Sequence, residues 1–248
     1  MNRRSLIAGL LLLASAGGIA EELYRQFQPA RTSRTRESTE WSITYTYNAL
    51  DRSHPRLLLI GDSICNGYQG TVRNKLGKIM NITFWASSKC VTDKDYFREL
   101  DQILSAYHYD VISFNNGLHS LTTNREEWKN AYQSAVDFIR KKCPDAKLFL
   151  TNNTPLKDPV KTAQAKELNQ IIAETAKLKK LPVIDLFSLM DPLDRNKFWN
   201  DTYHFRKPAV EMQAERIAGT VRALPGIAGS KADLVQRGTE TGPDGALK

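Results

Sequence analysis

The stretch that decides the fold of this protein is residues 56–64, which read RLLLIGDSI. Its apolar run predicts a buried β-strand, and Gly61 ends the run with a residue that permits a sharp turn. Ser63 then follows the carboxyl end of the strand, at the edge where ligands bind in open α/β sheets. If a helix begins within a few residues, its N-terminal N–H groups face an anion at Ser63. The alternative is that Gly-Asp-Ser serves only as a turn or a helix cap.

Strands and helices alternate outward from this stretch over residues 55–224. Short apolar segments predict strands, and apolar residues three or four apart predict helices. The expected strands are 56–60, 82–85, 111–114, 147–150 and 183–185, and the expected helices are 68–80, 96–107, 124–142, 161–179 and 208–224. This alternation indicates a parallel sheet with helices on both faces. Asn124 is expected to cap the helix that follows it.

The first residues of the chain have the pattern of an export signal. Arg3 and Arg4 precede an apolar run at residues 6–20, which ends in small residues suited to cleavage. Residues 1–20 are therefore interpreted as a signal peptide, and the arginine pair also resembles a twin-arginine signal. The run is shorter than the roughly 20 residues of a membrane span, although an uncleaved anchor is the alternative. We expect a periplasmic or extracellular protein that contacts the membrane only through an uncleaved signal.

Two further segments flank the alternating region. Residues 21–54 are polar at first and are expected to form a linker and an N-terminal arm. Within them, residues 41–47 alternate large side chains with small polar ones, which predicts a strand or a packed arm. Residues 225–248 are polar and rich in glycine, which is typical of a disordered tail.

The composition is that of an ordinary globular protein. The 248 residues are 41% hydrophobic and 25% charged, which suits one domain with tails. The formal charge of +8 suits an acidic polymer or an anionic membrane surface, although ordinary solvated surface charge is the better explanation. The lysines and arginines are scattered and no nucleic-acid motif is present, so we expect no nucleic-acid partner.

A second informative stretch is WNDTYHF at residues 199–205, between the last expected strand and the last expected helix. Asp201 and His204 are three residues apart there, so a single turn can present both side chains. A hydrolytic serine needs a base within hydrogen-bond reach, and the base needs an acid that orients it. Taken alone, such a pair is more often ordinary surface polarity or a chance resemblance to a metal site.

A third stretch, SFNNGLH at residues 113–119, ends the third expected strand. Side-chain amides at a strand's carboxyl end can donate hydrogen bonds to a developing oxyanion. Asn115 and Asn116 are the candidates for this role. The alternative is that Asn115, Asn116 and Gly117 only form a turn.

Together, the three stretches resemble the sequence blocks of the SGNH (GDSL-type) hydrolases, in order and in spacing, over residues 55–224. The resemblance implies a flavodoxin-like three-layer α/β/α sandwich, here with a five-stranded parallel sheet, and ester hydrolysis through an acyl-serine. It implies Ser63 as the nucleophile, His204 as the general base and acid, and Asp201 as the partner that orients His204.

The expected oxyanion hole departs from the family pattern. The resemblance implies that the backbone N–H of Ser63 forms one part of it. The family's second block offers a glycine N–H, but residues 86–90 here contain no glycine, so Ser88 or Lys89 is expected to donate instead. For the third block, Asn115 is the first choice of amide donor and Asn116 is the alternative.

The same resemblance bears on the substrate. The segment FNNGLH at residues 114–119 looks like a bacterial branch of the family that is associated with carbohydrate esters. His119 is a candidate to line the pocket in that branch, with a structural role as the alternative. The expected substrate is a small ester or an acylated glycan with a short group such as acetyl. Acyl transfer to a sugar hydroxyl, or a non-catalytic binding module, are the alternative functions.

No cofactor is expected. The histidines do not show the spacing of metal ligands; they are His54, His108, His119 and His204. The turn after the first strand also matches no dinucleotide-binding or phosphate-binding loop.

The three cysteines suggest a disulfide. Exported proteins meet oxidising conditions, and Cys65 and Cys90 both follow the carboxyl ends of strands expected to be neighbours, about 4.8 Å apart. A Cys65–Cys90 disulfide is therefore expected, with Cys143 as the free thiol. The alternative is that all three are small buried residues without a bond.

Overall fold

The structure is a computed structural model, which describes Phe27 and residues 32–227. The expected signal peptide at residues 1–20 and almost all of the expected tail at 225–248 lie outside the described residues. In the part that is described, none of the helices combines the length and the apolar character that crossing a membrane requires.

A six-stranded sheet forms the centre of the fold, with strand order β1-β3-β2-β4-β5-β6. The strands are β1 (Ser42–Thr46), β2 (Arg56–Gly61), β3 (Asn81–Ser87), β4 (Val111–Phe114), β5 (Lys147–Thr151) and β6 (Val183–Ile184). Strands β2 to β6 pair in parallel, as expected. The expected count of five strands is wrong, because β1 adds a sixth that pairs antiparallel with β3. A strand that reaches the sheet edge from the N-terminal arm needs no crossover helix, so it can run antiparallel.

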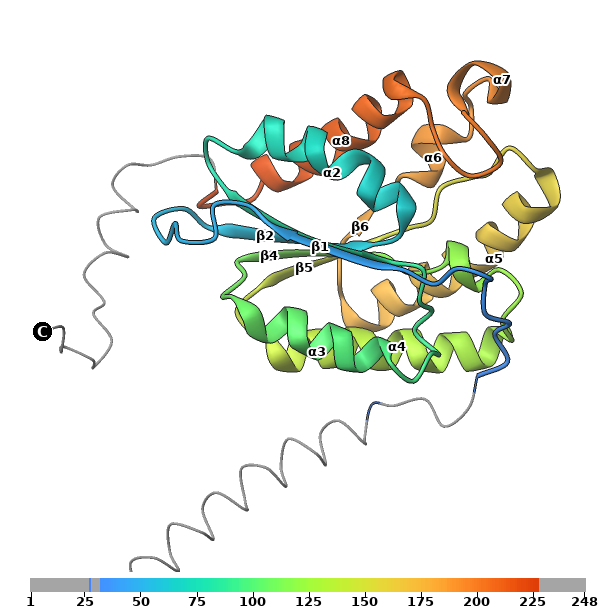
Figure 1. Ribbon diagram of the computed structural model, residues 1–248, viewed down its shortest axis with the longest axis horizontal. Helices are drawn as coiled ribbons and strands as arrows, with labels where there is room; N and C mark the ends of the chain where they lie inside the picture. The colour runs from blue at the N-terminus through green and yellow to red at the C-terminus, as the bar shows by residue number, and fades with distance from the viewer. Residues whose placement is uncertain (1–26, 28–31, 228–248) are drawn as a thin grey trace, which may run out of the picture.

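Helices cover both faces of the sheet, which confirms the expected three-layer α/β/α architecture. They are α2 (Ser63–Leu76), α3 (Tyr96–Ala106), α4 (Arg125–Lys142), α5 (Pro159–Lys179), α6 (Phe187–Met190), α7 (Arg195–Phe198) and α8 (Lys207–Arg222), with a 3₁₀ turn η1 (Leu118–Ser120). Helices α2 and α8 lie on one face, and α3, α4 and α5 lie on the other (Figure 1).

Helix α2 begins at Ser63 itself, five residues before the expected start at 68. Glycine weakens a helix, and Gly67 and Gly70 obscure its first turns in the sequence. The Asp62 side chain nevertheless caps the helix by accepting a hydrogen bond from the Ile64 N–H at 2.8 Å. The expected cap of α4 is confirmed, since Asn124 Oδ1 accepts from two first-turn N–H groups, at 3.1 Å each.

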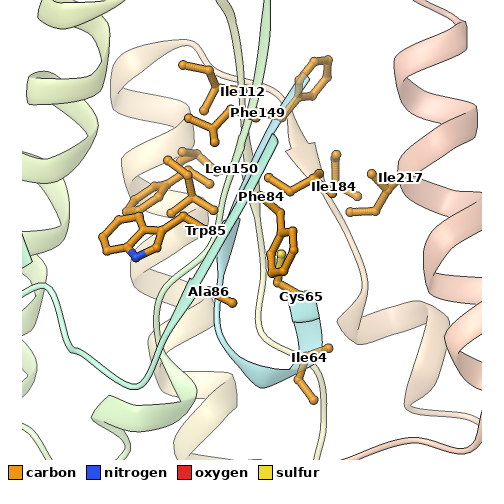
Figure 2. Close-up of a cluster of buried hydrophobic side chains, with 14 of the residues drawn as sticks. Ile64, Cys65, Phe84, Trp85, Ala86, Ile112, Phe149, Leu150, Ile184 and Ile217 are labelled. Atoms are coloured by element: carbon orange, nitrogen blue, oxygen red, sulfur yellow. The ribbon is translucent and has the colours of Figure 1, made fainter. Parts of the chain in front are cut away.

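The core lies on both sides of the central strands, and every residue of β2 is buried. Figure 2 shows the alternation along β3, where Phe84 points toward Ile217 of α8 and the next residue, Trp85, points to the opposite face. The Trp85 ring packs there against Tyr96 of α3, with ring centroids 5.1 Å apart. Burial on both faces explains why the strands read as continuous apolar runs.

The expected Cys65–Cys90 disulfide is wrong for this structure, in which all three cysteines are free thiols. Cys65 lies in the first turn of α2, on the face that α2 and α8 cover (Figure 2). Cys90 lies where the chain leaves β3 toward α3 on the other face, and its sulfur accepts a hydrogen bond from Ser120 Oγ at 2.8 Å. Neighbouring strand ends therefore do not bring these thiols together, because the chain leaves β2 and β3 toward opposite faces.

Candidate active site

The candidate nucleophile, Ser63, is the first residue of α2 and is partly exposed. The tight turn before it depends on Gly61, where a Cβ would lie 2.6 Å from the Cβ of Cys65. Within the described residues, neither the Oγ nor the backbone N–H of Ser63 forms a hydrogen bond. The first N–H groups of a helix have no partner inside the helix, so Ser63 offers both a hydroxyl and a backbone donor at the sheet edge.

Asp201 and His204 form a hydrogen-bonded pair in the loop before α8. His204 Nδ1 lies 2.8 Å from Asp201 Oδ2, and Asp201 Oδ1 accepts the backbone N–H groups of Tyr203 and His204, each at 2.8 Å. Since a carboxylate only accepts hydrogen bonds, Nδ1 carries the proton, and a neutral ring keeps its lone pair on Nε2. This tautomer is the one that a general base requires.

The electrostatics of this pair favour an ionised carboxylate. Partial burial alone would raise the pKa of Asp201, but hydrogen bonds from the backbone and ring of His204 outweigh it and lower the pKa. The side chains of Asp201 and His204 are 49% and 46% exposed. The imidazole is therefore held by a negative charge while one edge of the ring remains open to solvent.

The loop that carries the pair is anchored on the segment after β5. Trp199 and Phe205 form an isolated β-bridge, and their ring centroids lie 4.4 Å apart. Trp199 Nε1 donates to the Pro155 carbonyl at 3.3 Å, and the Lys157 N–H donates to the Thr202 carbonyl at 2.9 Å. These contacts hold the loop in a defined turn. Asp201 and His204, three residues apart in the sequence, can therefore form a hydrogen bond with each other.

Ser63 and the Asp201–His204 pair lie at the same edge of the sheet. Helix α2 packs against α8, and the two helices run in the same direction (Figure 1). Near the end of α2, Lys75 pairs with Glu211 and Glu215 of α8, at 3.5 and 3.0 Å. The start of α2, at Ser63, therefore lies at the same edge as the loop that precedes α8. No hydrogen bond joins Ser63 to His204 in the described part of the chain.

The backbone donors expected from the second block are already engaged. The Ser88 N–H donates to the Trp41 carbonyl at 3.1 Å, and the Lys89 N–H donates to Ser87 Oγ at 3.1 Å. The contact of Ser88 was not anticipated from the sequence. The carbonyl that accepts from the Ser88 N–H belongs to Trp41, in the arm before β1. Neither N–H is available to an oxyanion without a change in these contacts.

The amides of the third block tie loops together. Asn115 Nδ2 donates both to the Thr151 carbonyl at 2.9 Å and to Asn153 Oδ1 at 3.2 Å. Asn116 Nδ2 donates to the Lys89 carbonyl at 2.9 Å. Among the expected oxyanion donors, the N–H of Ser63 is thus the one that has no partner within the described residues.

Sequence reasoning missed Asn153 and the contact that fixes Gly117. A Cβ at Gly117 would overlap the side-chain amide of Asn153, so this glycine is required by close approach. Asn153 also lines a small pocket together with Asp62 and Leu118. The signal was available in the sequence, because Asn152 and Asn153 lie just beyond the carboxyl end of the fourth expected strand.

Sequence reasoning also missed the N-terminal arm, residues 32–41, which was expected to be largely a linker. The Arg34 side chain is only 1% exposed and forms an ion pair with Asp93. Its guanidinium donates to the carbonyls of Ser88 at 2.8 Å and His119 at 3.2 Å. The arm therefore joins the loops that follow β3 and β4. Such a contact leaves no local pattern, because it depends on which strands become neighbours.

The residues that the structure describes contain no group of three or more His, Cys, Asp and Glu side chains placed to hold a metal ion.

Comparison with known proteins adds to this picture. No family profile matches the sequence, and no curated protein matches it. A member of the lipolytic protein G-D-S-L family from Veillonella parvula matches the structure with a TM-score of 0.56 and 16% identity, over 68% of this chain and 99% of that chain.

Two esterase structures match over similar lengths. One is an acetylxylan esterase from Geobacillus stearothermophilus, in a catalytic-mutant form, with a TM-score of 0.56 and 14% identity over 66% of this chain and 92% of that chain. The other is a carbohydrate esterase of family 3 from Talaromyces cellulolyticus, with a TM-score of 0.54 and 14% identity over 67% of this chain and 95% of that chain. This chain therefore has the fold of the SGNH (GDSL-type) hydrolases, as its motifs indicate.

Proposed function

We propose that this protein is a serine esterase that removes short acyl groups, acetyl above all, from carbohydrates or from small esters. The observation that carries the proposal is the hydrogen-bonded Asp201–His204 pair. It lies at the sheet edge where the unpartnered hydroxyl and N–H of Ser63 begin α2. A nucleophile, an oriented base and a backbone donor are the parts that acyl transfer to a serine needs.

The first half of the reaction forms an acyl-enzyme. His204 Nε2 takes the proton from Ser63 Oγ as that oxygen attacks the ester carbonyl carbon. The carbonyl oxygen becomes an oxyanion, which accepts a hydrogen bond from the Ser63 N–H at the positive end of α2. The carbon–oxygen bond to the alcohol then breaks, and His204 returns its proton to the leaving alkoxide. The acyl group remains on Ser63.

The second half releases the acid. His204 takes a proton from a water molecule, whose oxygen attacks the acyl carbon and regenerates the oxyanion. Collapse of this intermediate expels Ser63 Oγ, which recovers its proton from His204. Asp201 stabilises the imidazolium that forms in each half, because its lowered pKa keeps the carboxylate charged at neutral pH.

The carbohydrate part of the proposal is supported by the matched structures, since an acetylxylan esterase and a carbohydrate esterase share this fold at low identity. The same residues would also transfer an acyl group to a sugar hydroxyl in place of water. We propose further that the protein is exported, because residues 1–20 have the pattern of a signal peptide.

The test combines covalent labelling with substrate turnover. The wild-type protein is treated with a fluorophosphonate probe, digested and mapped, and free acetate is measured after incubation with acetylated xylan. We expect the label on Ser63, and neither label nor acetate release from Ser63→Ala. Ser105→Ala, on the exposed surface of α3, is the matched control. Labelling at another serine, or acetate release by Ser63→Ala, would overturn the proposal.

A further inference from the structure

The N-terminal arm forms a second carboxylate–imidazole pair with the loop that follows β4. Glu37 Oε1 lies 2.6 Å from His119 Nδ1. An ionised carboxylate only accepts hydrogen bonds, so Nδ1 carries the proton and the neutral ring keeps a lone pair on Nε2. His119 Nε2 is buried and has no hydrogen-bond partner within the described residues. A buried acceptor of this kind calls for a donor, because leaving it unpaired costs free energy.

His119 is held from two sides. Glu37 binds the ring, and Arg34 Nε donates to the His119 carbonyl at 3.2 Å. Arg34 is fixed in turn by its ion pairs with Asp93 and Glu40. Glu37 contacts the ring itself, whereas Arg34 contacts the backbone of His119, and the His119 side chain is 16% exposed. The orientation of the imidazole is therefore set before any ligand binds.

His119 follows the strand next to the one that precedes the nucleophile turn. It belongs to η1, which directly follows β4, and β4 is the parallel neighbour of β2. The Asn115 N–H donates to the Ile60 carbonyl at 3.0 Å, which joins the ends of these strands. Leu118, the residue before His119, lines the same small pocket as Asp62, the residue before Ser63. The arm pair and the candidate nucleophile thus share one sheet edge.

We propose that His119 is a substrate-binding residue whose Nε2 accepts a hydrogen bond from a substrate hydroxyl close to the ester, and that Glu37 is the positioning residue that fixes this tautomer. The inference rests on the proposed esterase function and deepens it by naming the substrate class. The lone pair of Nε2 accepts a hydrogen bond only from an O–H or N–H donor. Partly acylated sugars carry such hydroxyl groups next to the ester, whereas simple aryl acetates carry none.

The test compares three substrates: a monoacetylated xyloside with a free neighbouring hydroxyl, the same compound with that hydroxyl methylated, and p-nitrophenyl acetate. We expect His119→Phe to lower kcat/KM for the free-hydroxyl sugar about tenfold or more, because a site built for a hydroxyl discriminates strongly when the pair is lost. The other two substrates change by less than about twofold, since they never form this hydrogen bond.

A second variant removes the tautomer constraint and keeps the ring. Glu37 is 45% exposed, so Glu37→Gln is expected to fold, and it is expected to show the same selective loss. Glu174→Gln, an exposed carboxylate on α5, is the matched control and should change none of the rates. An equal fall in kcat/KM for all three substrates would show that His119 takes part in the reaction or supports the fold instead. An unchanged kcat/KM would show that the substrate hydroxyl does not bind Nε2. Either result would overturn the inference.

A binding measurement separates this inference from the esterase proposal. Calorimetric titration of the free-hydroxyl sugar into Ser63→Ala gives its Kd without turnover, and adding His119→Phe is expected to weaken binding about tenfold. If Ser63→Ala still hydrolyses esters, the catalytic proposal fails, yet this comparison still decides the role of His119. Unchanged binding in the double variant would overturn the inference.

Discussion

His204 Nδ1 lies 2.8 Å from Asp201 Oδ2, and the same carboxylate also accepts the backbone N–H groups of Tyr203 and His204. One acidic side chain thus closes the turn and orients the imidazole. The turn ends directly before α8, whose partner helix α2 begins at Ser63. The stability of this loop and the geometry of the candidate base therefore depend on the same residue.

The first prediction concerns Ser63. Ser63→Ala removes the hydroxyl and keeps the fold, since Oγ forms no hydrogen bond within the described residues. Hydrolysis of p-nitrophenyl acetate should fall by several orders of magnitude, as it does when a catalytic serine is removed. Thermal melting should be unchanged from the wild type. A variant that keeps more than about a tenth of the activity would exclude Ser63 as the nucleophile.

The second prediction concerns Asp201. Asp201→Asn can donate to Nδ1, which moves the ring proton to Nε2 and makes it unavailable as a base. We expect kcat for p-nitrophenyl acetate to fall roughly 10³- to 10⁴-fold, by analogy with other serine–histidine–aspartate sites. Asp194→Asn, which alters the N-cap of α7 instead of the carboxylate bound to His204, should have a small effect. A loss below about tenfold would contradict the assigned role.

The third prediction concerns pH. Partial burial would raise the pKa of Asp201, but the hydrogen bonds from His204 outweigh it and lower the pKa. The carboxylate therefore stays charged, and continues to stabilise the imidazole, until the pH falls through that lowered pKa. A general base must be neutral to accept a proton, so the activity should rise with pH and then level off. The measurement is kcat/KM between about pH 5 and pH 9. A flat profile, with acylation limiting the rate, would rule out a histidine base.

The fourth prediction concerns the buried Arg34–Asp93 ion pair. Arg34→Met leaves the Asp93 carboxylate buried without its partner and should lower the free energy of unfolding by about 3–5 kcal/mol in urea melts. Burial raises the pKa of Asp93, so protonation at low pH should relieve the penalty and shrink the difference from the wild type. Arg36→Met is the control, because Arg36 is 58% exposed and lies 4.0 Å from its partner. If Arg36→Met lowered the free energy of unfolding as much as Arg34→Met does, the loss would not come from the buried ion pair.

The fifth prediction concerns the cysteines. Because all three are free thiols, titration of the denatured, non-reduced protein should find three thiols, and reductant should leave Tm unchanged. Burial raises the pKa of the Cys65 thiol to about 12, so alkylating reagents should not modify it in the native protein. Recovery of one thiol instead of three would reinstate a disulfide.

Several features followed from the sequence alone. The apolar run at residues 57–60 predicted a buried strand, because a strand with helices on both faces of its sheet is covered by apolar side chains on each face. The alternation of strands and helices predicted the three-layer sandwich. The spacing of Asp201 and His204 predicted a pair on one turn, and the structure contains their hydrogen bond. Each of these depends on contacts that are local in the chain or repeat at a regular period.

Other features were decided only by the tertiary structure. Lys89 and Asn115 were expected to serve an oxyanion, yet their N–H groups are engaged by Ser87, Thr151 and Asn153. The expected disulfide failed because the chain leaves two neighbouring strands toward opposite faces of the sheet. Arg34 and Glu37 reach the loops after β3 and β4 from an arm that carries no motif. Hydrogen bonds between residues far apart in sequence depend on which strands become neighbours and where each loop turns, and no local pattern records either.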